Sequence, residues 1–483
     1  MSAKAMALYF RDLHRVAEPR TSARRHGIRP VHSRARPLLI PLWLFLMALP
    51  AMPSMAMEEN PSTIARNAPA LAVLPPGTGH VHERLVIGMP WTTARVPAAA
   101  AGTDPADAAG RVRVVSTVDG RVLWSVDGQE VNERLGESVV ALGDVDGDGE
   151  PDLAVAAPLA TRPATATATK VNPGTPAELA GRILVLSGRD GTVLRQIWGD
   201  AYAQLGTSMA RLGDCDGDGV LDLVAGAPVA TVDEMHLAGE AWCISSRTGR
   251  VLFKVRGARK QGGLGEAVCG LTDLNGDGFM DFGVAARGSP YDGEVTLHSG
   301  KDGSLIGRIA APEKCKWFGR SLRPFSGAVD RMLLAASAPE AKRDDWRGAG
   351  SVFIYSIPSG VPVIDVGGAR TGQAFGFSLE RVGDLDGDGT EELCVGSPGA
   401  SATPDGGREE GAVQILSSGT GKTLWRLPGS VPGGRMGCAI AALGYSTSHP
   451  ARELVLASGR SQQLLVVDAR NGKPMRQLEK HLK

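Results

Sequence analysis

Hydrophobic and polar positions recur along this chain in one repeating unit from about residue 70 onwards. Each copy holds a short apolar run, such as LAVAAP ending at Pro158 and LVAGAP ending at Pro228. The run recurs as FGVAAR, LCVGSP, LLAASAP, LVIGMP and LVLASG, which makes seven copies. Short apolar runs separated by glycine are typical of β-strands, and no stretch after residue 60 keeps a helical periodicity. The pattern predicts an all-β fold made of seven repeats.

Two further features keep step with the apolar runs. One is a pair of hydrophobic segments joined by a tight turn that ends in glycine, because glycine readily adopts the positive φ that such hairpins need. These turns are Asp119-Gly120, Asp190-Gly191, Thr248-Gly249, Asp302-Gly303, Ser359-Gly360, Thr420-Gly421 and Asn471-Gly472. The other feature is an apolar residue followed by glycine, which opens six of the copies: Leu135-Gly136, Leu205-Gly206, Leu264-Gly265, Phe318-Gly319, Phe375-Gly376 and Met436-Gly437.

Each repeat therefore reads strand, loop, strand, connection, strand, tight turn, strand. Four antiparallel strands in succession form one blade of a β-propeller, and seven blades close a ring without open sheet edges. We expect residues 70–483 to form a seven-bladed β-propeller of four-stranded antiparallel blades. The approximate blades are 70–130, 131–200, 201–260, 261–312, 313–370, 371–430 and 431–483. A ring of six or eight blades, or an open β-solenoid, is the alternative.

Four copies carry an acidic loop between their first and second strands. Its nine positions follow the pattern Asp-x-Asp/Asn-x-Asp-Gly-x-x-Asp/Glu. If the chain curls tightly at the position 6 glycine, the side chains of positions 1, 3, 5 and 9 converge, and the carbonyl of position 7 adds a neutral oxygen. Calcium prefers six to eight such oxygen ligands. The expected side-chain ligands are Asp144, Asp146, Asp148 and Asp152; Asp214, Asp216, Asp218 and Asp222; Asp273, Asn275, Asp277 and Asp281; Asp384, Asp386, Asp388 and Glu392. The expected carbonyl ligands are those of Glu150, Val220, Phe279 and Thr390.

These loops predict calcium as the cofactor, with up to four ions. An EF-hand would need a glutamate at position 12. Aliphatic residues stand there instead: Val155, Ala225, Val284 and Val395. Magnesium keeps several waters and uses fewer carboxylates, and an acidic turn that binds nothing is disfavoured by four copies in register. The loops at Asp144 and Asp214 keep four aspartates and are expected to bind calcium most tightly, whereas the Asp384 loop ends in the longer Glu392 and the Asp273 loop has the neutral Asn275 and should bind more weakly.

The repeat resembles the FG-GAP repeat, the unit of the integrin α-chain amino-terminal propeller and of many secreted bacterial proteins. The likeness covers roughly residues 70–483 and rests on the acidic loops and on Phe-Gly in two copies. It also rests on Gly226-Ala227-Pro228, with near-matches at Ala156-Ala157-Pro158 and Gly396-Ser397-Pro398. Four copies have Leu-Gly or Met-Gly in place of Phe-Gly and the first copy lacks the element, which weakens the likeness there. The resemblance implies an integrin-like propeller.

The first 56 residues differ from the rest in charge and hydropathy. They hold nine basic and two acidic residues, whereas the remainder holds 43 basic and 50 acidic residues without a basic stripe. Nucleic acid is therefore not an expected partner. A basic segment, the apolar run 38–49 and the small residues before Met57 are typical of a secretory signal peptide. We expect cleavage after Ala56, a linker over 57–69, and a secreted, periplasmic or cell-surface protein without a stable membrane span. An uncleaved membrane anchor is the alternative.

The cysteines and isolated motifs add little chemistry. Six cysteines are spread over the repeats: Cys215, Cys243, Cys269, Cys315, Cys394 and Cys438. They form no Cys-x-x-Cys pair, which argues against zinc, and their spacing leaves any disulfide connectivity open. The segment 418–423 resembles the end of a phosphate-binding loop but aligns with the tight turns. His80 and His82 lie in the degenerate first loop and are weak metal candidates, while Trp124 and Trp425 are expected to pack between blades.

The expected function is a non-catalytic binding module, stabilised by calcium, for a protein or glycan ligand. In an up-and-down blade the acidic loops and tight turns share one face, and the other two connections share the opposite face. Long connections at 91–109, 159–180 and 401–410 belong to that opposite face, where we expect the ligand. The alternatives are an extracellular enzyme, such as a polysaccharide lyase or a quinone-dependent dehydrogenase, and a structural protein of the cell envelope.

Overall fold

The computed structural model describes residues 68–92, 109–163, 178–287, 293–313, 315, 317–328, 331–401, 408–445, 449–459 and 463–478. The chain divides into two units, Met1–Met57 and Glu58–Lys483, and every described residue lies in the second. The expected signal peptide and most of the expected linker lie outside the described residues. So do 93–108, 164–177 and 402–407, the central parts of the three long connections.

The described residues form 28 strands in seven four-stranded sheets. Blades 1 and 2 consist of β1 (Ala70–Leu74), β2 (Arg84–Met89), β3 (Arg111–Ser116) and β4 (Val122–Asp127), then β5 (Val139–Ala141), β6 (Leu153–Ala157), β7 (Arg182–Leu186) and β8 (Val193–Trp198). Blades 3 and 4 consist of β9 (Ser208–Arg211), β10 (Leu223–Ala227), β11 (Glu240–Ile244) and β12 (Val251–Arg256), then β13 (Leu264–Gly270), β14 (Phe282–Ala286), β15 (Glu294–His298) and β16 (Leu305–Ala310).

Blade 5 consists of β17 (Leu322–Gly327), β18 (Arg331–Ala338), β19 (Ser351–Ser356) and β20 (Val361–Gly367). Blade 6 consists of β21 (Ser378–Gly383), β22 (Glu392–Ser397), β23 (Ala412–Leu416) and β24 (Thr423–Pro428). Blade 7 consists of β25 (Met436–Leu443), β26 (Glu453–Ser458), β27 (Leu464–Asp468) and β28 (Pro474–Gln477). Among the described residues no helix is long and apolar enough to cross a membrane.

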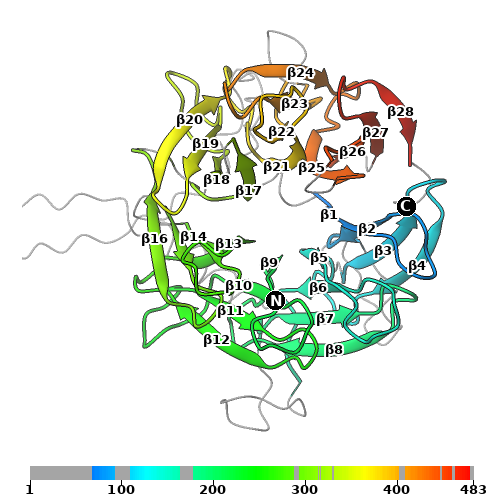
Figure 1. The fold of residues 1–483 in the computed structure, drawn as a ribbon, viewed down its shortest axis with the longest axis vertical. Helices are drawn as coiled ribbons and strands as arrows, with labels where there is room; N and C mark the ends of the chain where they lie inside the picture. The colour runs from blue at the N-terminus through cyan, green and yellow to red at the C-terminus, as the bar shows by residue number, and fades with distance from the viewer. Residues whose placement is uncertain are drawn as a thin grey trace, which may run out of the picture. The chain divides into compact units, whose positions relative to one another are not determined.

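The seven sheets stand around a central axis, with the first strand of each blade innermost and the fourth outermost (Figure 1). Each sheet is antiparallel and uses four strands that are consecutive in the chain. This arrangement confirms the expected all-β, seven-bladed propeller. The acidic loops join first and second strands, and the tight turns join third and fourth strands, so both lie on the same face of the ring.

Seven hydrophobic clusters hold the ring together, and each is shared mainly by two neighbouring blades. The second strands supply their centres, because both faces of such a strand are covered by adjacent blades. In blade 2, β6 is buried at every residue, whereas the outermost strand β8 is mostly exposed. This difference explains why the second strands are continuous apolar runs while the fourth strands are mixed.

Glycines of the FG-GAP pattern meet where one blade packs on the next. A Cβ atom added to Gly226 at the end of β10 would lie 2.0 Å from the carbonyl oxygen of Gly265 in blade 4. Gly88 meets Gly136 and Gly396 meets Gly437 at 2.2 and 2.1 Å in the same way. Real Cβ atoms do not come this close to backbone, so the close approach of neighbouring blades requires glycine at these positions.

The tight turns behave as the sequence predicts. Gly120, Gly191 and their five counterparts all have φ between 69° and 82°. Trp124 packs across to blade 2, where its indole N–H donates to the Gly188 carbonyl at 3.2 Å. Trp425 donates to the Ala469 carbonyl of blade 7 at 2.9 Å. The expectation that both tryptophans pack between blades is confirmed.

Blades 7 and 1 join without exchanging a strand. The Gly444 amide of blade 7 donates to Glu83 of blade 1 at 2.8 Å, and Arg476 donates to the Thr117 carbonyl at 3.0 Å. Arg476 also pairs with Glu453 at 2.6 Å. Side-chain contacts and a shared hydrophobic cluster therefore close the ring.

Candidate metal centres

The acidic loops are curled by hydrogen bonds from their own backbone. In blade 2, one carboxylate oxygen of Asp144 accepts the Gly147 amide at 2.7 Å, and the other accepts the Gly149 amide at 2.8 Å. Gly147 and Gly149 both have φ of 84°. Asp214, Asp273 and Asp384 accept the same pair of glycine amides in their own loops. The aspartate at position 1 and the two glycines therefore give the loop its curl without a cation.

In blades 2, 3 and 4 the carboxylate at position 9 accepts one amide from the loop and one from the tight turn. Asp152 is fully buried and accepts the amides of Val145 at 2.7 Å and Gly188 at 2.9 Å. Burial raises its pKa to about 6, despite those two hydrogen bonds. Asp222 has the same environment and a pKa of about 6 for the same reason, and burial also raises the pKa of Asp281. A cation in the loop would favour the charged form of these carboxylates.

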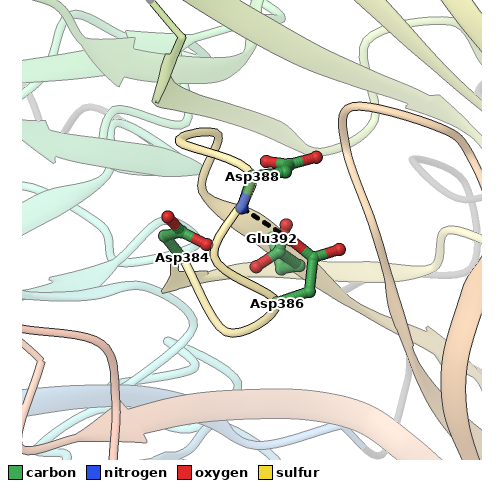
Figure 2. A group of neighbouring side chains, drawn as sticks. All are labelled: Asp384, Asp386, Asp388 and Glu392. Carbon is green, nitrogen blue, oxygen red and sulfur yellow. Dashed lines mark hydrogen bonds between the residues drawn. The ribbon is translucent and has the colours of Figure 1, made fainter.

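Most of the expected ligands come together in space. Asp384, Asp386, Asp388 and Glu392 of blade 6 each offer an oxygen within 4.8 Å of the others, and Figure 2 shows these four side chains gathered around one loop. The other loops bring three acids within this distance: Asp144, Asp146 and Asp152; Asp214, Asp216 and Asp218; Asp273, Asp277 and Asp281. These groups consist of hard oxygen donors, which fit calcium and magnesium better than softer metals.

Three expected side-chain ligands lie outside these groups. The carboxylate of Asp148 pairs with Arg189 at 3.0 Å. Asp222 accepts two backbone amides, from Cys215 at 2.7 Å and Ser246 at 3.2 Å. Asn275 has an amide side chain and contacts Asp277 through its Nδ2 at 2.9 Å.

The position 7 residues, whose carbonyls are expected ligands, share one contact. Their backbone amides donate to the position 5 carboxylate of the same loop at 2.8 to 3.0 Å. These residues are Glu150, Val220, Phe279 and Thr390. The hydrogen bond fixes the position 5 side chain against the loop, and the role of the carbonyls stays a prediction.

The blade 6 loop fits a cation best. Glu392 is fully buried, and its Oε2 accepts the Leu385 amide. Within the described part of the chain, its Oε1 has no hydrogen-bond partner. Leaving a buried carboxylate oxygen unpaired is costly, and burial raises the pKa of Glu392 to about 8. A cation held by the four acids would supply the missing partner.

The tight turn beside each loop decides whether a basic side chain competes with a cation. In blades 2 and 3 the turn carries an arginine, and Arg189 and Arg247 lie 3.0 and 3.4 Å from the position 5 aspartates. Lys301 occupies this place in blade 4 and glycine, Gly419, in blade 6. A Cβ atom at Gly419 would lie only 2.3 Å from Asp388. Blade 6 thus combines four carboxylates with no arginine in the turn, a feature that carboxylate count alone does not reveal.

In blade 1 the positive charge beside the loop is an arginine side chain. Arg84 stands immediately before the apolar run of blade 1, where blade 2 has Asp152. Its guanidinium pairs with the fully buried Glu150 at 2.8 Å and donates to the Gly188 carbonyl at 2.7 Å. His80 lies 3.1 Å from the same carboxylate, and His82 is exposed. Although burial opposes ionisation, the Gly79 amide, His80 and Arg84 keep the pKa of Glu150 below its usual value.

The opposite face of the ring carries arginine–aromatic contacts that sequence reasoning did not identify. Arg134 lies 4.0 Å from the ring centre of Trp91, and Arg287 lies 5.7 Å from that of Trp317. Arg287 also pairs with Glu266 at 2.7 Å. Trp91 and Arg287 lie in connections between second and third strands, and Arg134 and Trp317 lie in connections between blades. Glu266 lies near the start of β13. The only sequence signal for a shared surface was that these residues flank strands at the same end of their blades.

Comparisons with known proteins agree with this architecture. The family model of the FG-GAP repeat matches residues 136–174. Integrin alpha-5 of Xenopus laevis is 28% identical over 217 residues, which is 42% of this chain and 20% of that protein. Integrin alpha-V of Gallus gallus is 28% identical over 224 residues, which is 41% of this chain and 20% of that protein. The chain therefore matches about a fifth of the length of these relatives.

The FG-GAP match begins at Gly136, which meets Gly88 of blade 1, and includes the Asp144 loop and β6. The solved structure of BBS1N in complex with ARL6DN is 10% identical, with a TM-score of 0.46 over 86% of this chain and 93% of that one. The repeat-family match, the integrin relatives and the seven blades agree with one another. Residues 136–174 thus match the FG-GAP repeat, and about two fifths of the chain is similar to integrin alpha chains.

Proposed function

We propose that this protein is an exported, calcium-stabilised propeller that binds a protein or glycan ligand without catalysing a reaction. The observation that carries the proposal is the difference between the two faces of the ring. One face gathers the four acid clusters and the tight turns. The other face carries the long connections and the contacts of Arg134 with Trp91 and of Arg287 with Trp317.

The acidic face would serve stability. In each loop a cation would be held by the three or four clustered acids and would relieve their mutual repulsion. In blades 2, 4 and 6 it would also link the position 1 and position 9 residues, and hence the loop to the second strand. The cation supplies only a positive charge shared among oxygens, and the loop backbone supplies the shape. Calcium fits better than magnesium because the clusters offer several carboxylates.

The opposite face would serve recognition. Tyr202 and Trp346 are 55% and 45% exposed, and both lie on this face. Exposed aromatics beside arginine and glutamate are typical of binding surfaces for proteins, and aromatic rings also stack on sugars. The Tyr202 hydroxyl donates to Glu178 at 3.1 Å, which holds the ring in place. A rigid frame with such side chains on its connections can bind a ligand without a reactive centre.

The proposal is tested by screening the full chain against glycan and extracellular-protein arrays. The double variant Tyr202→Ser/Trp346→Ser removes exposed aromatic area from the proposed face. The matched control, Val81→Ser/Val118→Ser, removes apolar area of comparable exposure from the acidic face. We expect a ligand whose binding weakens at least tenfold in the aromatic variant and stays unchanged in the control. A ligand that responds only to the control, or turnover of an arrayed glycan, would contradict the proposal.

A further inference from the structure

Two core positions lie in one shared hydrophobic cluster in every blade that has an acidic loop. One is position 2 of the acidic loop. The other lies in the third strand of the blade, opposite the second residue of the apolar run. In blades 2, 4 and 6 each pair is aliphatic and belongs to one hydrophobic cluster. These pairs are Val145 with Val185, Leu274 with Leu297, and Leu385 with Ile415.

In blade 3 both positions are cysteine. Cys215 is loop position 2, and Cys243 pairs with Val224 across β10 and β11. Both side chains belong to the cluster between blades 3 and 4. A contact with the Cys215 side chain, together with burial, raises the pKa of the Cys243 thiol. Their shared cluster and this contact make the two cysteine side chains neighbours.

The Cys215 thiol is partly accessible to solvent, whereas the Cys243 thiol is buried within the sheet. Cys215 is partly exposed, and its Sγ also contacts the Gly213 carbonyl at 3.4 Å. Its amide donates to Asp222 at 2.7 Å, which fixes the loop backbone against the start of β10. Cys243 is 1% exposed in the middle of a sheet.

We propose that Cys215 and Cys243 are a disulfide-forming pair that fastens the blade 3 acidic loop to β11. A small disulfide such as oxidised glutathione would be the oxidant. The Cys215 thiolate attacks one of its sulfurs and releases one glutathione thiolate. Cys243 then loses its proton and attacks the Cys215 sulfur, forming the protein disulfide and releasing the second glutathione thiolate. Two electrons pass to the oxidant, and its two thiolates take up the two protons.

The disulfide would make the blade 3 loop differ from the other three acidic loops. Cys215 lies between Asp214 and Asp216, two of the three acids that cluster in this loop. A covalent link to β11 would hold these residues near their clustered positions even without a cation. This inference concerns the thiols alone and does not depend on calcium binding.

The test starts from the fully reduced chain under native conditions. It is incubated with oxidised glutathione, quenched with a maleimide in denaturant so that every remaining thiol is accessible, digested and analysed by mass spectrometry without reduction. We expect two of the six thiols to escape alkylation and the peptides of Cys215 and Cys243 to be joined. The variants Cys215→Ser and Cys243→Ser should each abolish the link, while Cys438→Ser, which removes a thiol in another blade, should keep it.

Two outcomes would overturn the proposal. One is alkylation of both thiols after oxidation of the wild-type chain. The other is a stable glutathione adduct on Cys215 with Cys243 still reduced, because it would show that the second thiol does not reach the first. Circular dichroism of each variant confirms that the blade is folded when the thiols are counted.

Discussion

Single side chains beside the acidic loops decide how much negative charge each loop presents. Replacing Arg247 with glutamine leaves the Asp218 carboxylate without its cationic partner in blade 3. We expect the calcium affinity of this loop to rise up to about fivefold, since an exposed ion pair contributes at most about 1 kcal/mol. Isothermal titration would measure it in a chain whose other loops carry Asp144→Asn, Asp273→Asn and Asp384→Asn. Arg250→Gln, in the same turn, is the control, and an equal gain from it would argue against a specific effect of Arg247.

His298 provides a pH dependence that is separate from the acidic loops. Burial lowers the pKa of His298, whose ring stacks on Phe282 and contacts Thr296 and Gly303. The folded chain therefore favours the neutral ring. The stabilising contribution is complete above the unfolded pKa of about 6.5 and is lost as the pH falls toward the lower folded pKa, by at most about 1.4 kcal/mol per pH unit.

We expect His298→Asn to flatten the acid side of the stability curve. Denaturant unfolding between pH 8 and about pH 5, where histidine titrates, would measure the slope. His236→Asn removes an exposed histidine and is the matched control. A slope that is the same in all three proteins would mean that His298 does not change its protonation on unfolding.

The sequence could predict which acidic side chains belong to each loop, but not which residues of the tight turn lie beside them. The spacing of Asp384 to Glu392 is local, and the curl of nine residues follows from glycine and from the backbone amides. Arg189 and Gly419 act from a tight turn that is some 30 to 40 positions away in the chain, and their effect depends on how strands pair. For the same reason the pairing of Cys215 with Cys243 was invisible in the cysteine spacing.

At the level of strands and loops, blade 1 shows how a degenerate repeat keeps its place in the ring. The sequence marks its loop as lacking the acids, and the structure shows Arg84 paired with Glu150 of the next blade. Both side chains are almost completely buried. The loop is therefore held by a guanidinium that belongs to the chain, and this blade has no need of a bound cation.

We expect Glu150→Gln to lower the free energy of unfolding by about 3–5 kcal/mol, because the variant leaves a buried guanidinium unpaired. The loss should be the same in calcium and in excess chelator, and Arg84→Met/Glu150→Leu should recover part of it. Chemical denaturation in both buffers is the measurement. A loss confined to the calcium buffer would show instead that Glu150 acts through the blade 2 loop.

At the level of the whole molecule, repeat counting predicted the number of blades because every blade uses the same strand order. The glycine contacts between blades and the apolar second strands follow from that repeat. The side-chain contacts that close the ring could not be predicted, since Arg476 and Thr117 lie at opposite ends of the propeller sequence. The arginine–aromatic face was hidden for a similar reason, because its residues come from separate blades.

The expected export can be checked on the intact protein. If the apolar run at 38–49 is a signal peptide, the mature chain should begin at Met57. Amino-terminal sequencing of material recovered outside the cytoplasm would identify the first residue. A chain that still begins before residue 38 would point to a membrane anchor or a different start.

Thermal unfolding of the full chain with and without calcium tests the cation requirement of the propeller. A ligand that binds only the folded state stabilises it by about 2.7 kcal/mol per site at a hundredfold excess over its Kd. We expect calcium to raise the Tm, excess chelator to lower it, and magnesium to act much more weakly, with metal analysis finding calcium in the purified protein. Glu392→Gln should reduce the calcium effect. A Tm that is identical in calcium and in chelator, with no calcium bound, would contradict the proposed role of the acidic loops.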